Sequence, residues 1–277
     1  MHPAQNVIDQ WSGSAPFWEK HRDLIRLMYG PVTEALLEAA GIGLGHTVLD
    51  VGTGTGEPAL TVAGVVGPEG KVVGVDPVPA MVAAAGRAAD KLGIDNARFD
   101  IAPADHMEFP DNTFDAAVSR FGVMFFSSPV SGVREMLRVL KPGRKLALAA
   151  WHYSESNPYH DTLTRIVERY AESPSASPNA PGPFRFADPG KLLDVIQHAG
   201  LGAATEHLLR FTIHAPISVE KFWNLRVDMG LREKLAPLSA EQVAAIRSEA
   251  LVALREYSTE AGMTFPGQVW IVSGTKP

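Results

Sequence analysis

The chain has 277 residues, a length that favours one large domain or one domain with a sizeable insert. Hydrophobic residues make up 45% and charged residues 20%, as in globular proteins, whereas a disordered chain would be poorer in apolar residues. Lys and Arg number 25 against 31 Asp and Glu, and the net charge of −6 argues against a nucleic-acid-binding surface over the whole molecule. Because cysteine is absent, disulfides, cysteine-ligated zinc, iron–sulfur clusters and thiol nucleophiles are excluded.

Residues 1–45 predict an N-terminal helical cap. Pro16 is expected to open a helix that runs to about Tyr29, and a second helix is expected over residues 32–40. The first residues lack the basic start and apolar core of a signal peptide, and no apolar stretch reaches the roughly 18–20 residues that span a bilayer. We therefore expect a cytoplasmic protein with no membrane span.

Residues 46–151 alternate between short apolar runs and segments of helical length. The runs are residues 47–51, 71–75, 97–101, 114–119 and 144–151, and the helical segments are 57–66, 78–92 and 130–140. Alternating strands and helices are typical of a parallel sheet covered by helices on both faces. Continuous apolar runs indicate strands buried on both sides.

Residues 152–277 predict helical cap segments and the last two strands of the same sheet. Helices are expected over 157–170, from Asp188-Pro189 to Ala199, and over 219–235 and 240–257. Ser239 and Gln242 have the spacing of a capping box at the start of the last helix. Strands are expected over 203–213 and 268–273, and the Ser/Pro-rich residues 173–183 predict an exposed loop.

The strongest motif is Gly52-Thr53-Gly54-Thr55-Gly56, at the point where the first strand becomes the first helix. Glycines there let the backbone turn tightly and approach a ligand at the carboxyl end of the strand. A dinucleotide fingerprint would need glycine at position 57, which is Glu57. Asp50, two residues before Gly52, would repel a pyrophosphate but suits a ligand with an amino group and a sulfonium.

With this pattern the chain resembles the class I S-adenosylmethionine (SAM)-dependent methyltransferases. The second strand ends in Asp76, whose carboxylate would accept hydrogen bonds from the ribose hydroxyls, although taken alone it could simply cap the next helix. The resemblance places Pro77 and Met81 beside the adenine. It also implies that Asp105, otherwise a plain turn residue, faces the adenine amino group, and that the next backbone amide reaches the ring.

Two later stretches narrow the resemblance. Residues 109–119 and the turn Leu140-Lys141-Pro142-Gly143 are similar to those of the small-molecule branch that includes the ubiquinone- and menaquinone-biosynthesis methyltransferases. The resemblance implies an α/β fold, with a doubly wound, mostly parallel seven-stranded sheet of order 3-2-1-4-5-7-6 and an antiparallel strand 7. The cofactor-binding residues that it implies are Asp50, Gly52, Thr53, Gly54, Gly56, Asp76, Pro77, Met81, Ala104, Asp105, His106, Ser119, Arg120 and Phe121.

The implied reaction is methyl transfer from SAM to an oxygen, nitrogen or carbon atom of a small molecule, releasing S-adenosylhomocysteine. Ser119-Arg120-Phe121-Gly122 stands where enzymes that methylate base amines or glutamine amides carry an Asn/Asp-Pro-Pro-aromatic motif. Arg120 could orient an anionic substrate or form a local ion pair. Aromatic side chains after residue 151 could line an apolar or aromatic acceptor pocket or simply pack between helices. Together with the N-terminal helices, they predict a lid over the bound cofactor.

His152, just after the fifth strand, is a candidate general base, with a structural role as the alternative. No metal is expected, since no histidines have ligand spacing on a helix. A SAM-binding protein without transferase activity and a nucleotide-dependent oxidoreductase are the alternative functions. The sequence does not indicate the oligomeric state.

Overall fold

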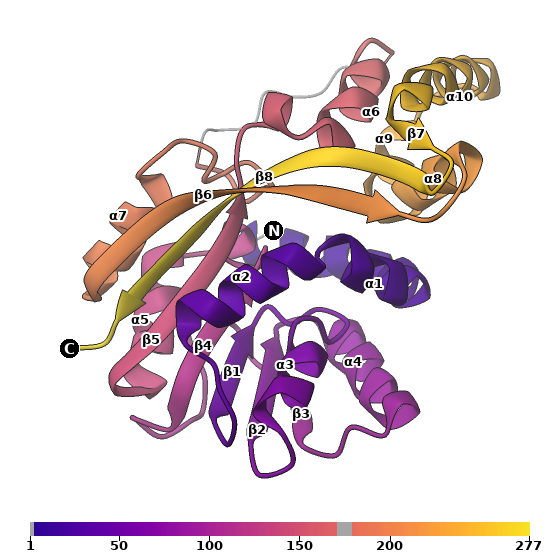
Figure 1. Ribbon diagram of the computed structural model, residues 1–277. Coiled ribbons are helices and arrows are strands. Elements are labelled where there is room, and N and C mark those ends of the chain that lie inside the picture. The colour runs from indigo at the N-terminus through magenta and orange to yellow at the C-terminus, as the bar shows by residue number, and fades with distance from the viewer. Residues whose placement is uncertain (1–2, 171–178) are drawn as a thin grey trace.

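The computed structural model describes residues 3–170 and 179–277. A single sheet runs through the molecule in the order β3-β2-β1-β4-β5-β8-β6, with a two-residue strand β7 (Ser258–Thr259) added to β8 (Figure 1). The long strands are β1 (Thr47–Val51), β2 (Lys71–Asp76), β3 (Ala97–Ile101), β4 (Phe114–Arg120), β5 (Leu140–Trp151), β6 (Gly202–Ala215) and β8 (Gly262–Thr275). The fold is therefore the predicted α/β fold, with β7 as one addition to the seven strands.

The strand order reverses beside β1. The chain moves outward from β1 to β2 and β3, then crosses back to β4 on the other side of β1, and all of these pairs are parallel. Parallel strands carry their carboxyl ends on one edge, and a reversal of this kind leaves a crevice at that edge. Because β1 and β4 are buried along nearly their whole length, they hold the two sides of this crevice rigidly.

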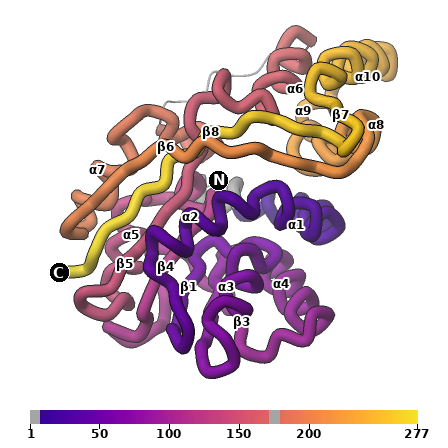
Figure 2. Tube along the Cα trace, in the orientation of Figure 1, coloured from indigo at the N-terminus to yellow at the C-terminus, as the bar shows by residue number. Residues whose placement is uncertain are grey.

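Strand β8 runs antiparallel to both of its neighbours. It pairs with β5 from Lys145↔Thr275 to Trp151↔Val269, and with β6 as far as Ala215↔Met263. The first residues of β8 and the last residues of β6 therefore form a two-stranded extension beyond the end of β5 (Figure 2). An isolated two-stranded ribbon is only marginally stable, and here helices pack around it.

Those helices come from the C-terminal half of the chain. They are α6 (Pro158–Glu168), α8 (Val219–Arg226), α9 (Arg232–Leu235) and α10 (Ala240–Leu254), which gather around the extension. Helix α7 (Lys191–Ala199) lies away from the extension, beside β6 and α5 (Figure 1). The capping box of Ser239 and Gln242 is present at the start of α10. The predicted helix over 219–235 is interrupted, because residues 227–231 form a π-helical turn in which Gly230 leaves helical geometry. The predicted start at Asp188-Pro189 is also wrong, since Gly190 is the residue that precedes α7.

The parallel half carries α3 (Ala59–Val66), α4 (Pro79–Leu92) and α5 (Pro129–Val139), and the N-terminal helices are α1 (Pro3–Met28) and α2 (Gly30–Ala40). Pro16 does not open α1 but lies inside it. The earlier turns stay helical because Trp11 and Ala15 pack on Val78 and Met81 at the start of α4, and this burial outweighs the loss of one backbone hydrogen bond.

The structure also bears on the predicted strand lengths, on the Ser/Pro-rich loop and on membrane-spanning helices. Strands β6 and β8 are longer than the apolar runs indicated, because their antiparallel pairing extends into their polar ends, and β5 begins earlier, at Leu140, which pairs with Phe114 of β4. Residues 173–178 of the predicted Ser/Pro-rich loop lie outside the described residues. Within the described ranges, no helix combines the length and apolarity that crossing a bilayer would require.

Candidate active site

A cavity of about 610 Å³ opens at the carboxyl ends of β1 and β4, within the size range of small-molecule sites. One half is lined by the turns that follow the parallel strands, and the other by side chains of α1, α6 and the segments after α8. The predicted residues that line it are Gly52, Thr53, Gly54, Asp76, Pro77, Met81, Ala104, Asp105, Arg120 and Phe121.

The floor of the cavity is the turn after β1. Gly52 has φ +75°, and a side chain at this position would place its Cβ 3.1 Å from Cα of Gly122. Both the positive φ angle of Gly52 and the close approach of the Gly122 backbone therefore require glycine at position 52. The Gly52 and Thr53 N–H groups donate to the Val75 carbonyl at 2.8 and 3.0 Å, which fixes the turn against β2.

Asp76 stands at the end of β2, beside this turn. Its Oδ2 accepts the Gly54 N–H and its Oδ1 the Val78 N–H, each at 3.0 Å. Burial raises the pKa of Asp76 to about 6, against the opposing effect of the two N–H donors. Since a carboxylate offers about four lone-pair sites, each oxygen retains room for one more donor from a ligand.

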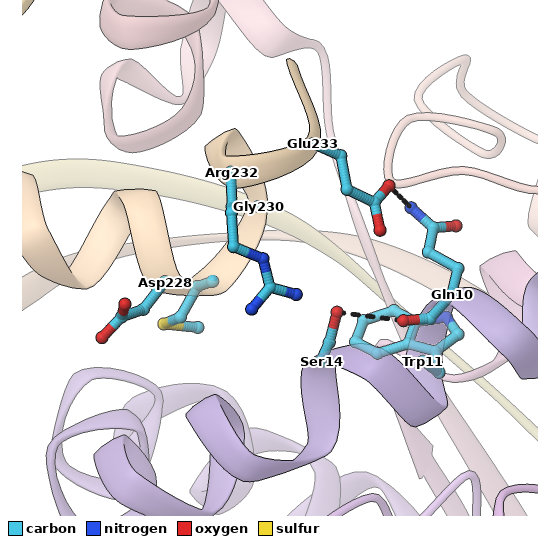
Figure 3. Close-up of a pocket in the computed structure, with 8 residues that line it drawn as sticks. Gln10, Trp11, Ser14, Asp228, Gly230, Arg232 and Glu233 are labelled. Carbon is cyan, nitrogen blue, oxygen red and sulfur yellow. Dashed lines mark hydrogen bonds between the residues drawn. The ribbon is translucent and has the colours of Figure 1, made fainter. Parts of the chain in front are cut away.

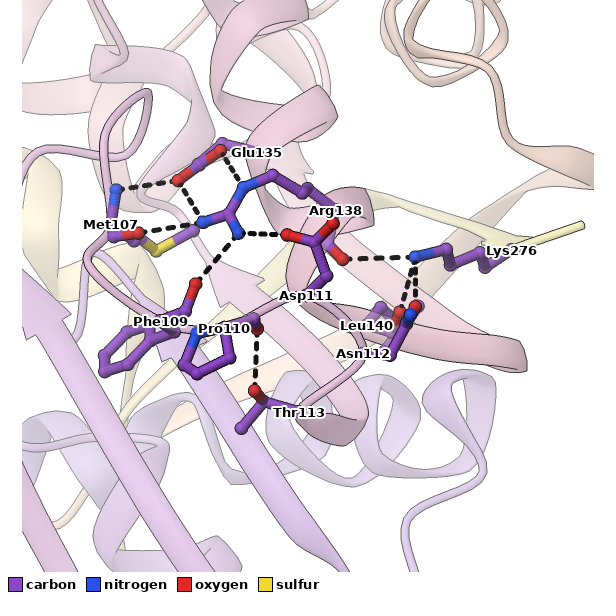
Figure 4. Close-up of polar contacts among 10 residues, drawn as sticks. All are labelled: Met107, Phe109, Pro110, Asp111, Asn112, Thr113, Glu135, Arg138, Leu140 and Lys276. Carbon is purple, nitrogen blue, oxygen red and sulfur yellow. Dashed lines mark hydrogen bonds and ion pairs between the residues drawn. The ribbon is translucent and has the colours of Figure 1, made fainter.

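The loop after β3 forms the third side and is held by Arg138 of α5 (Figure 4). The guanidinium donates to Glu135, to Asp111 and to the carbonyls of Met107 and Phe109, at 2.6–2.9 Å. Glu135 also accepts the Met107 N–H at 2.8 Å, and the hydrogen bond from Arg138 lowers its pKa. This network positions the neighbouring Ala104 and Asp105 at the cavity.

Arg120 lies buried at the end of β4. Its Nη1 donates to Thr33 Oγ1 at 2.6 Å and its Nη2 to the Glu57 carbonyl at 3.3 Å. Burial lowers its pKa, and the facing Glu57 and Asp50 side chains oppose that effect. Of the two roles considered from the sequence, the structure shows Arg120 inside a local charged cluster that also borders the cavity.

The remaining predicted residues do not line the cavity: they are Asp50, Gly56, His106, Ser119 and His152. Asp50 lies wholly buried beneath the turn, where its Oδ2 accepts the Ala59 N–H at 3.1 Å at the start of α3. Burial raises the pKa of Asp50 to about 7. The expectation that Asp50 faces the ligand is thus not met, because its side chain points from β1 into the protein.

Gly56, Ser119 and His106 have local roles. Cβ of a residue at 56 would come within 2.8 Å of Leu60, so Gly56 lets α3 pack closely. Ser119 Oγ donates to the Val51 carbonyl at 2.6 Å and ties β4 to β1. His106 is exposed on its loop.

His152 is held away from the cavity by the sheet itself. Its backbone N–H donates to the Gln268 carbonyl of β8 at 3.1 Å, and its ring packs against Tyr153 and Trp270 at 4.6 and 5.1 Å. It is therefore not placed to accept a proton from a substrate in this cavity.

Aromatic rings line the other half. Phe121 has φ +63°, a strained angle for a bulky residue, and its ring stacks on Trp151 at 4.5 Å with an interplanar angle of 1°. Trp151 in turn meets Tyr29 at 5.7 Å and His160 at 4.6 Å. A continuous aromatic wall thus leads from the glycine turn to α6.

His160 of α6 and Arg226 of α8 also line the cavity, although the sequence patterns did not predict either residue there. For His160 the sequence does carry one signal, the spacing of polar residues along its helix. His160, Thr164 and Glu168 recur every four residues, which puts them on one helix face, and all three line the cavity. Arg226 is the last residue of α8, whose mixed sequence gave no such pattern.

At the rim, α1 meets the segment around α9 over a second hollow of about 60 Å³ (Figure 3). Gln10 Nε2 donates to Glu233 at 3.5 Å, and Arg232 Nη2 donates to the Gly13 carbonyl at 3.2 Å. Nearby, Asp228 pairs with Lys20 at 2.8 Å and with His21 at 2.7 Å. These polar contacts join the N-terminal helix to the C-terminal cap over the cavity.

The sequence matches the family described as "Methyltransferase domain" over residues 43–181, half of the chain. It is 33% identical to the ubiquinone/menaquinone biosynthesis C-methyltransferase UbiE of Pasteurella multocida over 136 residues, 49% of each chain. It is 32% identical to the uncharacterized methyltransferase YcgJ of Bacillus subtilis over 151 residues, 54% of this chain and 58% of that one. The chain thus spans about half the length of these curated relatives.

Solved structures extend the likeness to the whole fold. The crystal structure of YcgJ from Bacillus subtilis matches 89% of this chain and 98% of its own, with a TM-score of 0.58 and 21% identity. The [4+2]-cyclase SpnF matches 95% of this chain and 96% of its own, with a TM-score of 0.55 and 20% identity. A cyclase among these neighbours shows that the fold alone does not determine the reaction. The family match covers half of the chain and includes the glycine turn and Asp76, which line the cavity. The chain therefore belongs to the methyltransferase domain family.

Proposed function

We propose that this protein binds SAM in the polar half of the cavity and transfers its methyl group to a small molecule held in the aromatic half. The observation that carries the proposal is that one cavity joins the glycine turn, Asp76 and Asp105 to the aromatic wall. A cofactor and an acceptor bound there would be neighbours, and reacting groups must be neighbours for direct transfer.

The residues of the polar half fit the cofactor. Asp76 offers both carboxylate oxygens to the ribose hydroxyls, since each accepts only one N–H in the protein. The Gly52–Gly54 backbone lies open to the cavity for the amino-acid portion, and Val78 and Met81 give the adenine an apolar side. Asp105, exposed on the third turn, is placed to accept a hydrogen bond from the adenine amino group.

The protein's own contribution to the reaction is alignment and exclusion of water. When bound, SAM supplies a methyl group that its positive sulfur already activates. The aromatic wall and α1 cover the cavity, so that the acceptor atom, the methyl carbon and the sulfur can be held in line. The acceptor atom in this proposal is oxygen, nitrogen or carbon.

A nicotinamide dinucleotide fits the site less well. Glu57 stands where a dinucleotide fingerprint has glycine, and its side chain borders the cavity while accepting a hydrogen bond from Thr61 Oγ1 at 2.7 Å. A carboxylate at this position would repel a pyrophosphate.

Calorimetry tests the proposal directly. S-adenosylhomocysteine is expected to bind, and NAD and NADP are not. Conversion of SAM in the presence of a panel of small acceptors then separates an enzyme from a binding protein. Binding of NADP with no binding of S-adenosylhomocysteine would overturn the proposal.

A further inference from the structure

The end of the cavity farthest along the aromatic wall holds two side chains that the cofactor does not account for, the part-buried His160 and the buried Arg226. One is His160, on the first turn of α6, and the other is Arg226, the last residue of α8. Both line the cavity. Neither belongs to the turns proposed to hold SAM.

His160 is enclosed by rings. Its centroid lies 4.6 Å from Trp151, 4.8 Å from Tyr159 and 5.5 Å from Phe184. Its Nε2 is buried and has no hydrogen-bond partner in the protein. Burial holds the pKa of His160 well below its usual range, and the charge of Arg226 acts in the same direction. Both effects favour the neutral imidazole, whose unpartnered Nε2 is the nitrogen left to accept a hydrogen bond from a ligand.

Arg226 is a buried cation without a carboxylate partner. Its guanidinium lies over the Tyr159 ring at 4.3 Å, and its Nε has no hydrogen-bond partner. Ion pairs within the described ranges include none to Arg226, whereas Arg22 pairs with Asp23 at 3.0 Å and Lys234 with Glu168 at 3.7 Å. Arg120, another buried cation at the cavity, faces Glu57 and Asp50.

Burying an unpaired charge is costly, and a cation–π contact offsets only part of that cost. A ligand that brings a negative charge would supply the missing partner. A ring would be complementary to the surrounding walls, because aromatic pairs at 4.5–7 Å stabilise one another.

We propose that this end of the cavity binds an aromatic acceptor through a hydroxyl group, with His160 accepting the hydroxyl proton and Arg226 stabilising the resulting oxyanion. The proposal rests on the proposed function, and within it selects oxygen as the methylated atom. His160 Nε2 takes the proton as the acceptor oxygen forms a bond to the methyl carbon. The carbon–sulfur bond breaks, its electron pair stays on sulfur as a neutral thioether, and the imidazolium later releases its proton to water.

The probe is 4-nitrophenol, whose ionised form absorbs visible light and whose neutral form does not. Titrated into the whole protein, it should bind and ionise at a lower pH than in free solution, because Arg226 favours the anion. Nitrobenzene, which lacks the hydroxyl, and 4-nitrobenzylamine, which brings a cation, should bind more weakly. The expected loss for Arg226→Met is on the order of tenfold to a hundredfold in 4-nitrophenol affinity, and Arg226→Lys should retain part of it.

His160→Gln separates the base from a purely structural role. With 4-nitrophenol as acceptor and SAM as donor, its kcat should fall on the order of a hundredfold at a pH where the bound phenol is still neutral. That deficit should shrink at a pH where the phenol is already ionised. The matched controls are His152→Gln, whose ring lies outside the cavity, and Arg247→Met on the exposed face of α10. Both should behave as the unaltered protein.

S-adenosylhomocysteine affinity and the thermal unfolding midpoint of each variant are measured alongside. If S-adenosylhomocysteine binds but the protein holds nitrobenzene as tightly as 4-nitrophenol, the acceptor proposal is wrong and the proposed function stands. An unchanged 4-nitrophenol affinity in both Arg226 variants, or a His160→Gln deficit that does not vary with pH, would also overturn it. Failure of S-adenosylhomocysteine to bind would overturn the proposed function and this proposal with it.

Discussion

Replacing Asp76 by asparagine tests the proposed cofactor site at its most constrained point. The substitution keeps the shape of the side chain and removes its charge. Asparagine can still accept the Val78 N–H with its single oxygen, but its amide group would then face the Gly54 N–H, where donor meets donor. The variant therefore loses one internal hydrogen bond and one acceptor for the ribose.

The magnitudes follow from that geometry. A hydrogen bond to a charged group contributes about 1.5–3 kcal/mol, so the affinity for S-adenosylhomocysteine should fall roughly 10- to 150-fold. The unpaired Gly54 N–H should lower the free energy of unfolding by about 1–3 kcal/mol. Part of this lost stability should be regained at neutral pH. Burial raises the pKa of Asp76 to about 6, so the charged carboxylate destabilises the folded protein above that pH, and the neutral asparagine does not.

The assay is calorimetric titration with S-adenosylhomocysteine, with thermal unfolding to confirm that the variant is folded. Asp100→Asn is the control, since Asp100 lies on the neighbouring strand β3, pairs with Arg98 at 3.1 Å and does not line the cavity. A folded Asp76→Asn protein whose affinity stays within about twofold of the unaltered protein would refute the ribose assignment.

Four further results are expected. The affinity for S-adenosylhomocysteine should fall as the pH is lowered through about 6, because Asp76 then gains a proton and loses its charge; the same titration of Asp76→Asn should be flat. Gly52→Ala should destabilise the protein and abolish cofactor binding, whereas Gly45→Ala, with a similar φ of +74° but open space around it, should cost only backbone strain of about 1 kcal/mol; equal effects in the two variants would contradict the role of the Gly122 contact. Hydrogen exchange in α1 should slow when S-adenosylhomocysteine binds; protection confined to residues 50–56, 76 and 105 would show a preformed site without a lid. Methyl transfer should survive exhaustive chelation with EDTA, since among the described residues no three His, Asp or Glu side chains group as a metal site; loss of turnover that a divalent ion restores would contradict this.

The parallel half of the sheet could be predicted because its signals are local. Apolar runs bounded by glycine give the strands, and a turn with positive φ can hardly use any residue except glycine. The predicted residues that line the cavity lie at the last residues of β1, β2, β3 and β4 or within a few residues after them. Parallel strands carry these residues to the same edge, so their position in the chain already fixes their position in the site.

Other features depend on the direction in which a side chain points and on packing between distant segments. These are the features for which the structure differs from the sequence-based expectation. Asp50 and Ser119 stand next to cavity residues in the chain, but alternation along a strand turns their side chains inward. Pro16 stays inside α1 only because Trp11 and Ala15 meet α4, a contact between segments far apart in sequence.

The α/β class, the glycine turn and the acid at the end of β2 could be predicted from local signals, because each is encoded within a few neighbouring residues, whereas the strand order was expected only from the resemblance to a family. Which side chains line the far end of the cavity depends on packing between segments that are distant in the chain. His152 and His160 lie eight residues apart, yet pairing of β5 with β8 holds the first against Trp270, while the turn into α6 carries the second to Trp151 and Arg226. Pairing of β6 and β8 brings α8 to this site from far along the chain, and no local pattern encodes that distance.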